Sequence, residues 1–161
     1  MEKSLKQLLL KDICARLLYG VRGKVKADTI VPHKYDTDGF PLETTFDVNV
    51  ELQRIDISND EVFVSTFDND EDLGIYIEEC QIEGTPWTVE EFIPYLRPMS
   101  SMTKEERLVY EQRLHDVGRS IDVIDADDVV SHIDWLLSHH FDYRGLIEKG
   151  LAIEAPEGIY K

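Results

Sequence analysis

The chain has 161 residues, with 33 Asp and Glu against 17 Lys and Arg, so its formal net charge is −16. A hydrophobic fraction of 42% is that of a globular protein, which excludes a disordered acidic tail. Because no apolar run is long enough for a transmembrane helix or a signal peptide, we expect a cytoplasmic protein without membrane contact. Cys14 and Cys80 are too few and too far apart for a disulfide framework or a thiolate zinc site.

The first predicted element is a helix over about residues 5–18. Ser4 and Gln7 have the spacing of a capping box, and Leu5, Leu9 and Ile13 recur at helical spacing. Gly20 follows as a stop signal. A strand is predicted over residues 21–31, and the Asp, Gly and Pro residues of 33–42 predict a turn.

The clearest strand signal lies at residues 46–53, where apolar and polar residues alternate strictly. The apolar positions are Phe46, Val48, Val50 and Leu52, and the polar positions are Asp47, Asn49, Glu51 and Gln53. A turn at residues 58–60 predicts an antiparallel hairpin with a strand over 62–67, and a further strand is expected over 75–82. The alternation shifts at Arg54 and Ile55, which predicts a bulge.

After Gly84 the sequence pattern changes from strand signals to helix signals. Thr88 with Glu91, and Thr103 with Glu106, each have the spacing of a capping box, with Gly118 placed as a helix stop. A third helix is expected over about 126–140, followed by a short turn that Asp142 caps and that ends at Gly150.

Together these elements predict a single α+β domain over residues 1–161. It would contain an N-terminal helix, a mainly antiparallel sheet of about four strands, and two to three C-terminal helices packed on that sheet. The acidic, β-rich part would span about 21–83 and the helical part about 86–150.

The charge is concentrated in one part of the chain. Residues 36–91 hold 17 acidic residues and a single basic one, Arg54. Such a field disfavours direct nucleic-acid binding and favours a protein partner with a basic surface. The candidate interaction residues are Asp47, Glu51, Asp68, Asp70 and Asp72. The favoured function is therefore a non-enzymatic interaction protein, with no catalytic residue and no cofactor assigned.

A calcium-binding hairpin at Asp68–Glu79 is one alternative. Asp68, Asp70 and Asp72 occupy positions 1, 3 and 5 of a calcium loop, and Glu79 occupies position 12. Leu73 stands where that loop requires glycine, and the flanking segments have strand signals instead of helix signals. The other interpretation is a solvated acidic turn.

A metal-dependent enzyme is a second alternative. His132, His139 and His140 crowd the third helix and its exit, with Asp128 one turn before His132. Imidazole and carboxylate groups suit a transition metal or acid–base catalysis. Histidines that interact favourably with a helix C-terminus are the other interpretation.

Two segments, Pro94–Thr103 and His139–Pro156, resemble uncharacterised proteins of gut anaerobes and their phages and prophages. The resemblance covers the C-terminal part of the chain and, more loosely, the N-terminal helix. It implies a mobile-element origin and a setting in the host cytoplasm, and it brings no activity or catalytic residue.

Overall fold

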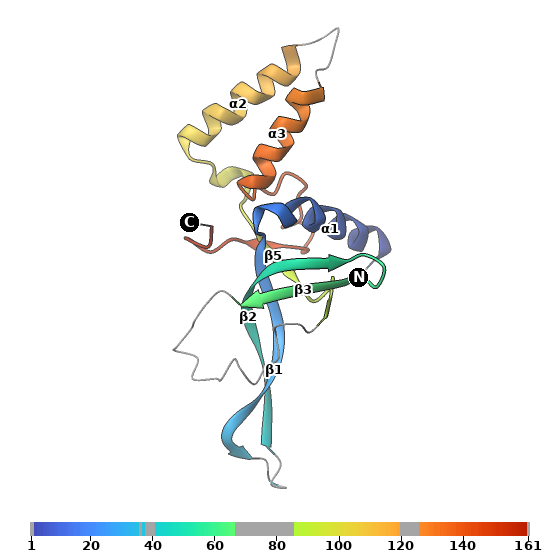
Figure 1. The fold of residues 1–161 in the computed structure, drawn as a ribbon. Coiled ribbons are helices and arrows are strands. Elements are labelled where there is room, and N and C mark those ends of the chain that lie inside the picture. The colour runs from blue at the N-terminus through green and yellow to red at the C-terminus, as the bar shows by residue number, and fades with distance from the viewer. Residues whose placement is uncertain (1, 36, 38–40, 67–85, 120–125, 161) are drawn as a thin grey trace. The chain divides into compact units, whose positions relative to one another are not determined.

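The computed structural model describes residues 2–35, 37, 41–66, 86–119 and 126–160. The fold is α+β, with an N-terminal helix, a six-stranded sheet and two C-terminal helices (Figure 1). The chain divides into two units, Met1–Pro94 and Tyr95–Lys161. The division falls within strand β5, further along the chain than the change in sequence pattern after Gly84.

Helix α1 covers Lys3–Arg16 and continues into the 3₁₀ helix η1 at Leu17–Tyr19. Gly20 ends this segment in the left-handed conformation, at φ 67°, as the sequence predicts. The predicted capping box is wrong, because the helix already begins at Lys3 and its N-cap residue makes no side-chain hydrogen bond. Lys6 forms an ion pair with Asp60, at 3.0 Å, which ties α1 to the turn between β2 and β3.

Two long strands and a shorter third strand form the centre of the first unit. Strand β1 covers Arg22–Tyr35, β2 covers Pro41–Asp56 and β3 covers Glu61–Thr66, each antiparallel to the next. The side chains of one face are buried and form the core with Leu9 and Ile13 of α1. They are Val25, Ala27, Val48, Val50, Leu52, Val62 and Val64.

The predicted bulge is confirmed, because the β2–β3 register shifts between Leu52 and Arg54. The predicted turn over 33–42 is too long, since β1 continues to Tyr35 and β2 begins at Pro41. Pro32 therefore lies inside a strand. Proline is tolerated there because it lies where the β1–β2 register shifts, between Ile30 and Tyr35.

The sheet has more strands than expected, and they are not all antiparallel. Strands β4, at Trp87–Thr88, β5, at Ile93–Leu96, and β6, at Ile153–Glu154, complete the order β4-β3-β2-β1-β5-β6. Strands β5 and β6 run parallel. The three added strands are too short to produce an alternation signal. The strand expected over 75–82 lies outside the described residues.

The helix signal at Thr88 is wrong, although its side-chain interaction forms. Glu91 Oε2 accepts hydrogen bonds from Thr88 N–H, at 2.8 Å, and from Thr88 Oγ1, at 2.9 Å. The chain then turns and enters β5, because Ile93 and Pro94 pair with β1 instead of continuing a helix.

The second unit contains the 3₁₀ helix η4, at Met99–Ser101, helix α2, at Lys104–Arg119, and helix α3, at Ala126–Ser138. The capping box at Thr103 is confirmed, because Thr103 N–H donates to Glu106 Oε2 and Glu106 N–H donates to Thr103 Oγ1. Helix α2 continues past Gly118, which is not its stop.

The core of the second unit lies at the C-terminal end of α3 and the segment after it. Leu136, Leu137, Phe141 and Leu146 are buried. Asp142 caps the following turn as predicted, accepting hydrogen bonds from the N–H groups of Leu146 and Ile147 at 2.7 and 2.8 Å. The turn thereby holds the buried Leu146 in the core of the second unit.

Candidate interaction surface

The predicted acidic face of β2 carries Asp47 and Glu51, and basic residues of β1 lie beside both. Lys24 Nζ lies 2.5 Å from Asp47, and Arg22 Nε lies 3.2 Å from Glu51. The register brings them together, because Arg22 lies directly opposite Glu51. Lys24 lies opposite Asn49 and is therefore diagonal to Asp47 on the same face. Cross-strand pairs of opposite charge reduce the field that this face presents to a partner.

The remaining candidate interaction residues, Asp68, Asp70 and Asp72, lie outside the described residues, as does Glu79. The calcium-binding hairpin therefore stays a prediction.

The three histidines of the predicted metal cluster make three different sets of contacts. The His132 ring lies 5.3 Å from that of Tyr110, and burial, with a smaller effect of Arg113, lowers the pKa of His132 below its usual value. His139 lies against Trp135, with ring centroids 4.5 Å apart. His140 is buried and stacks on Tyr160 at 3.6 Å. Within the described ranges, no three His, Cys, Asp or Glu side chains are placed to hold a metal ion.

A bidentate ion pair fixes the start of α2. Arg97 donates from both terminal nitrogens to Glu106, at 2.8 Å each, and its guanidinium lies 4.3 Å from the centre of the Phe141 ring. The Arg97 hydrogen bonds, opposed by burial and aided by Thr103 N–H, lower the pKa of Glu106 to about 2. The capping signal identified Glu106 from the sequence, but nothing local to that signal indicated Arg97.

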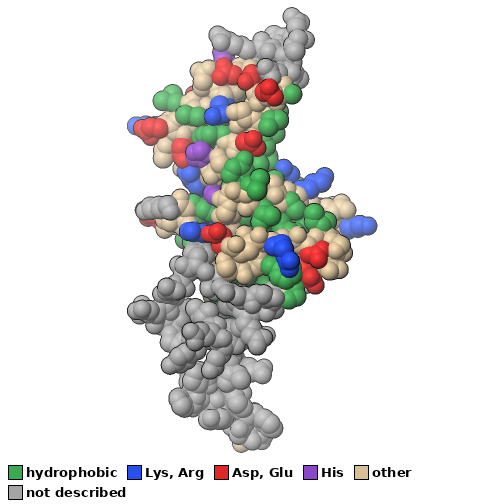
Figure 2. All heavy atoms as spheres, in the orientation of Figure 1, with side chains coloured by type: hydrophobic (Ala, Val, Ile, Leu, Met, Phe, Trp, Pro, Cys, Tyr) green, Lys and Arg blue, Asp and Glu red, His purple; other side chains and the backbone are tan. Residues whose placement is uncertain are grey.

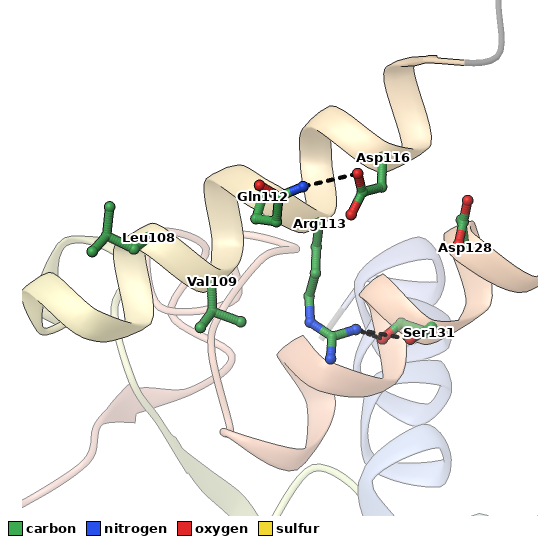
Figure 3. Close-up of a pocket in the computed structure, with 7 residues that line it drawn as sticks. All are labelled: Leu108, Val109, Gln112, Arg113, Asp116, Asp128 and Ser131. Carbon is green, nitrogen blue, oxygen red and sulfur yellow. Dashed lines mark hydrogen bonds between the residues drawn. The ribbon is translucent and has the colours of Figure 1, made fainter.

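A groove of about 570 Å³ lies between α2 and α3. Its lining residues are Leu108, Val109, Gln112, Arg113, Asp116, Asp128 and Ser131 (Figure 3). Arg113 reaches from α2 to α3, where it donates to Ser131 Oγ at 2.8 Å and to the Ser131 carbonyl at 3.2 Å. These two hydrogen bonds link α2 to α3 within the groove.

Helix α2 exposes much of its apolar surface. None of its residues from Lys104 to Gly118 is buried, and Leu108 is 68% exposed. Val109 and Leu114 of α2 are also exposed, as is Val130 of α3. Figure 2 shows apolar and acidic side chains next to one another on this surface. Sequence reasoning missed it, because the apolar residues of α2 follow no single stripe.

Comparison with protein-family models, curated proteins and solved structures finds no match for this chain. No described helix is long and apolar enough to cross a membrane.

Proposed function

We propose that this protein is a non-enzymatic interaction protein of phage or mobile-element origin, which binds a basic protein surface in the cytoplasm. One observation carries the proposal: the sixteen-residue helix α2 has no buried residue from Lys104 to Gly118 and exposes Leu108, Val109 and Leu114. Helix stability in proteins comes mainly from packing an apolar face. A partner that covers α2 would provide that packing.

The charge supports a basic partner. The net charge of −16 steers positively charged surfaces toward the protein and repels phosphate backbones. An excess of negative charge increases the rate of association with a positively charged partner and makes that rate depend on the salt concentration. The origin and the compartment follow from the resemblance of Pro94–Thr103 and His139–Pro156 to proteins of phages and their hosts.

Affinity capture tests the proposal directly. The whole protein is immobilised, exposed to a lysate of an anaerobic gut bacterium at low salt, and eluted with a salt gradient. We expect proteins of basic isoelectric point, absent from a control column that carries an unrelated globular protein of equal negative charge. Recovery of the same proteins from both columns, or of no basic protein, would contradict the proposal.

A further inference from the structure

The groove between α2 and α3 has two chemically different ends. Leu108 and Val109 line one end, where they are 68% and 42% exposed. Asp116 and Asp128 line the other end, and Arg113 stands between the two ends with its guanidinium held by Ser131 (Figure 3). A ligand that fills the groove therefore meets apolar surface first and carboxylates about two helical turns further along α2.

The carboxylate end is available to a cation. Asp116 accepts a hydrogen bond from Gln112 at 2.9 Å and lies 3.7 Å from His115 Nδ1, and its side chain is 41% exposed. Asp128 is exposed, and the described residues offer it no hydrogen bond or ion pair. Arg113, the cation that lines the groove, already donates to Ser131. Arg113 keeps its positive charge but directs its guanidinium to Ser131, so a Lys or Arg brought in by a partner would meet two exposed or half-exposed carboxylates at this end of the groove.

Resting on the proposed function, we infer that this groove binds an amphipathic basic helix of the partner protein. The helix presents a large apolar residue to Leu108 and Val109 and a Lys or Arg to Asp116 and Asp128. On α2, Val109 and Asp116 are seven residues apart, which spans about 10 Å. The recognised pattern is accordingly an apolar residue and a basic residue two turns apart on one face, a helix-in-groove mode of binding.

Charge distinguishes this occupant from a second copy of the chain. Two copies would each bring a net charge of −16, and their repulsion opposes association at low salt. The same field attracts a basic helix. The exposed apolar residues alone would suit either a partner helix or a second copy of the chain. The carboxylates of Asp116 and Asp128 favour a cationic ligand and therefore a basic helix.

Fluorescence anisotropy with a designed peptide tests the inference on the full chain. The probe is a labelled Ala- and Gln-rich helix about five turns long, in which each Lys follows a Leu by seven residues. A control peptide of identical composition places each Lys five residues after a Leu, on the opposite side of the helix. We expect the first peptide to bind at least about tenfold more tightly than the control.

Matched variants then locate the site. Leu108→Ala and the double variant Asp116→Asn/Asp128→Asn are each expected to weaken peptide binding about tenfold or more. Leu18→Ala and Asp134→Asn, which change exposed residues of η1 and α3 outside the groove lining, are expected to change it less than about twofold. Equal effects of groove and control variants would overturn the assignment, even if the peptide binds.

Two further outcomes separate the groove from the proposed function. Salt-sensitive capture of basic proteins that the groove variants leave unchanged would overturn the groove and keep the function. Failure of the wild-type protein to capture any basic protein would overturn both the groove assignment and the proposed function. Sedimentation velocity addresses the second copy: a dimer that Leu108→Ala dissociates would assign the groove to self-association and overturn the inference.

Discussion

Asp12 and Arg16 of α1 are charged residues whose side chains have no exposed surface. Both side chains are 0% exposed, and Arg16 Nε donates to Asp12 Oδ2 at 2.6 Å. Two ions removed from water lose hydration that their mutual attraction and hydrogen bonds must replace. Removal of either partner therefore leaves the other charge buried without this ion pair, which destabilises the folded state.

Asp12→Ala is expected to lower the free energy of unfolding by about 3–5 kcal/mol, because it leaves the Arg16 guanidinium buried without its carboxylate. Urea denaturation at neutral pH measures the change. Lys11→Ala, the exposed neighbour, is the control and is expected to change stability by less than about 0.5 kcal/mol. Similar losses in the two variants would show that the buried pair has no special role.

Glu106 predicts a pH dependence of stability. Its pKa falls from 4.5 to about 2 on folding, so the carboxylate stabilises the folded state fully above pH 4.5. That contribution decreases as the pH falls from 4.5 toward 2, where the folded state also takes up the proton. Glu106→Gln should therefore lower the free energy of unfolding by about 1–2 kcal/mol at pH 7 and by progressively less below pH 4.5.

Urea denaturation of the wild type and the variant at several pH values measures this difference. Subtracting the two curves removes the general effect of protonating the other carboxylates. Glu105→Gln, exposed in the same turn of α2, is the matched control. A difference for Glu106→Gln that stays constant from pH 7 to pH 3 would contradict the assignment to Arg97 and Thr103.

At the scale of elements, two glycines give opposite predictions for the same substitution. A Cβ on Gly23 of β1 would lie 2.5 Å from the Ile93 carbonyl oxygen and 2.8 Å from the Phe92 ring. Gly23→Ala is therefore expected to push β5 from β1 and to destabilise the protein by about 1–3 kcal/mol. A Cβ on Gly118 of α2 would meet no atom of the described residues within 4 Å, so Gly118→Ala should stabilise by about 0.5–1 kcal/mol.

Thermal unfolding of both variants checks these signs. Amide hydrogen exchange adds a local readout for Gly23→Ala, since the loss of protection is expected in β5 first. Destabilisation by Gly118→Ala would indicate that α2 does not hold its helical form through Gly118 in solution.

Elements with a strong signal inside one segment could be predicted from the sequence. The alternation of Val48, Val50 and Leu52 places them in the core, and the Thr103–Glu106 capping box marks the start of α2. The Thr88–Glu91 pair has the same local chemistry, yet the chain enters β5 because strand pairing with β1 prevails. Tertiary pairing decides such cases, and a local pattern does not contain it.

The candidate sites were harder to predict for the same reason. Asp47 and Glu51 form an acidic face by sequence, but the register of β1 places Lys24 and Arg22 against them. The groove between α2 and α3 is lined by residues of both helices, such as Val109 and Ser131, which lie far apart in the sequence. No periodic pattern in the sequence marks them as neighbours. Only the packing of two helices creates it.

At the scale of the whole molecule, the net charge of −16 determines how the protein responds to salt. Self-repulsion among carboxylates destabilises a compact state, and salt screens it over about 10 Å at 0.1 M. The ion pairs Lys24–Asp47, Arg22–Glu51 and Arg97–Glu106 lose some attraction as salt rises. Lys24–Asp47 and Arg22–Glu51 are partly exposed and contribute little each, so the screening of repulsion is the larger effect.

The thermal midpoint is accordingly expected to rise with sodium chloride. At matched ionic strength, calcium chloride should raise it to the same extent if Asp68–Glu79 is a solvated acidic turn. A larger rise with calcium, abolished by a chelator and by Asp70→Asn, would instead assign a calcium site to that segment, because a ligand of the folded state adds its binding free energy. A midpoint that falls with every salt would mean that ion pairs outweigh repulsion, and that the acidic field is weaker than the net charge implies.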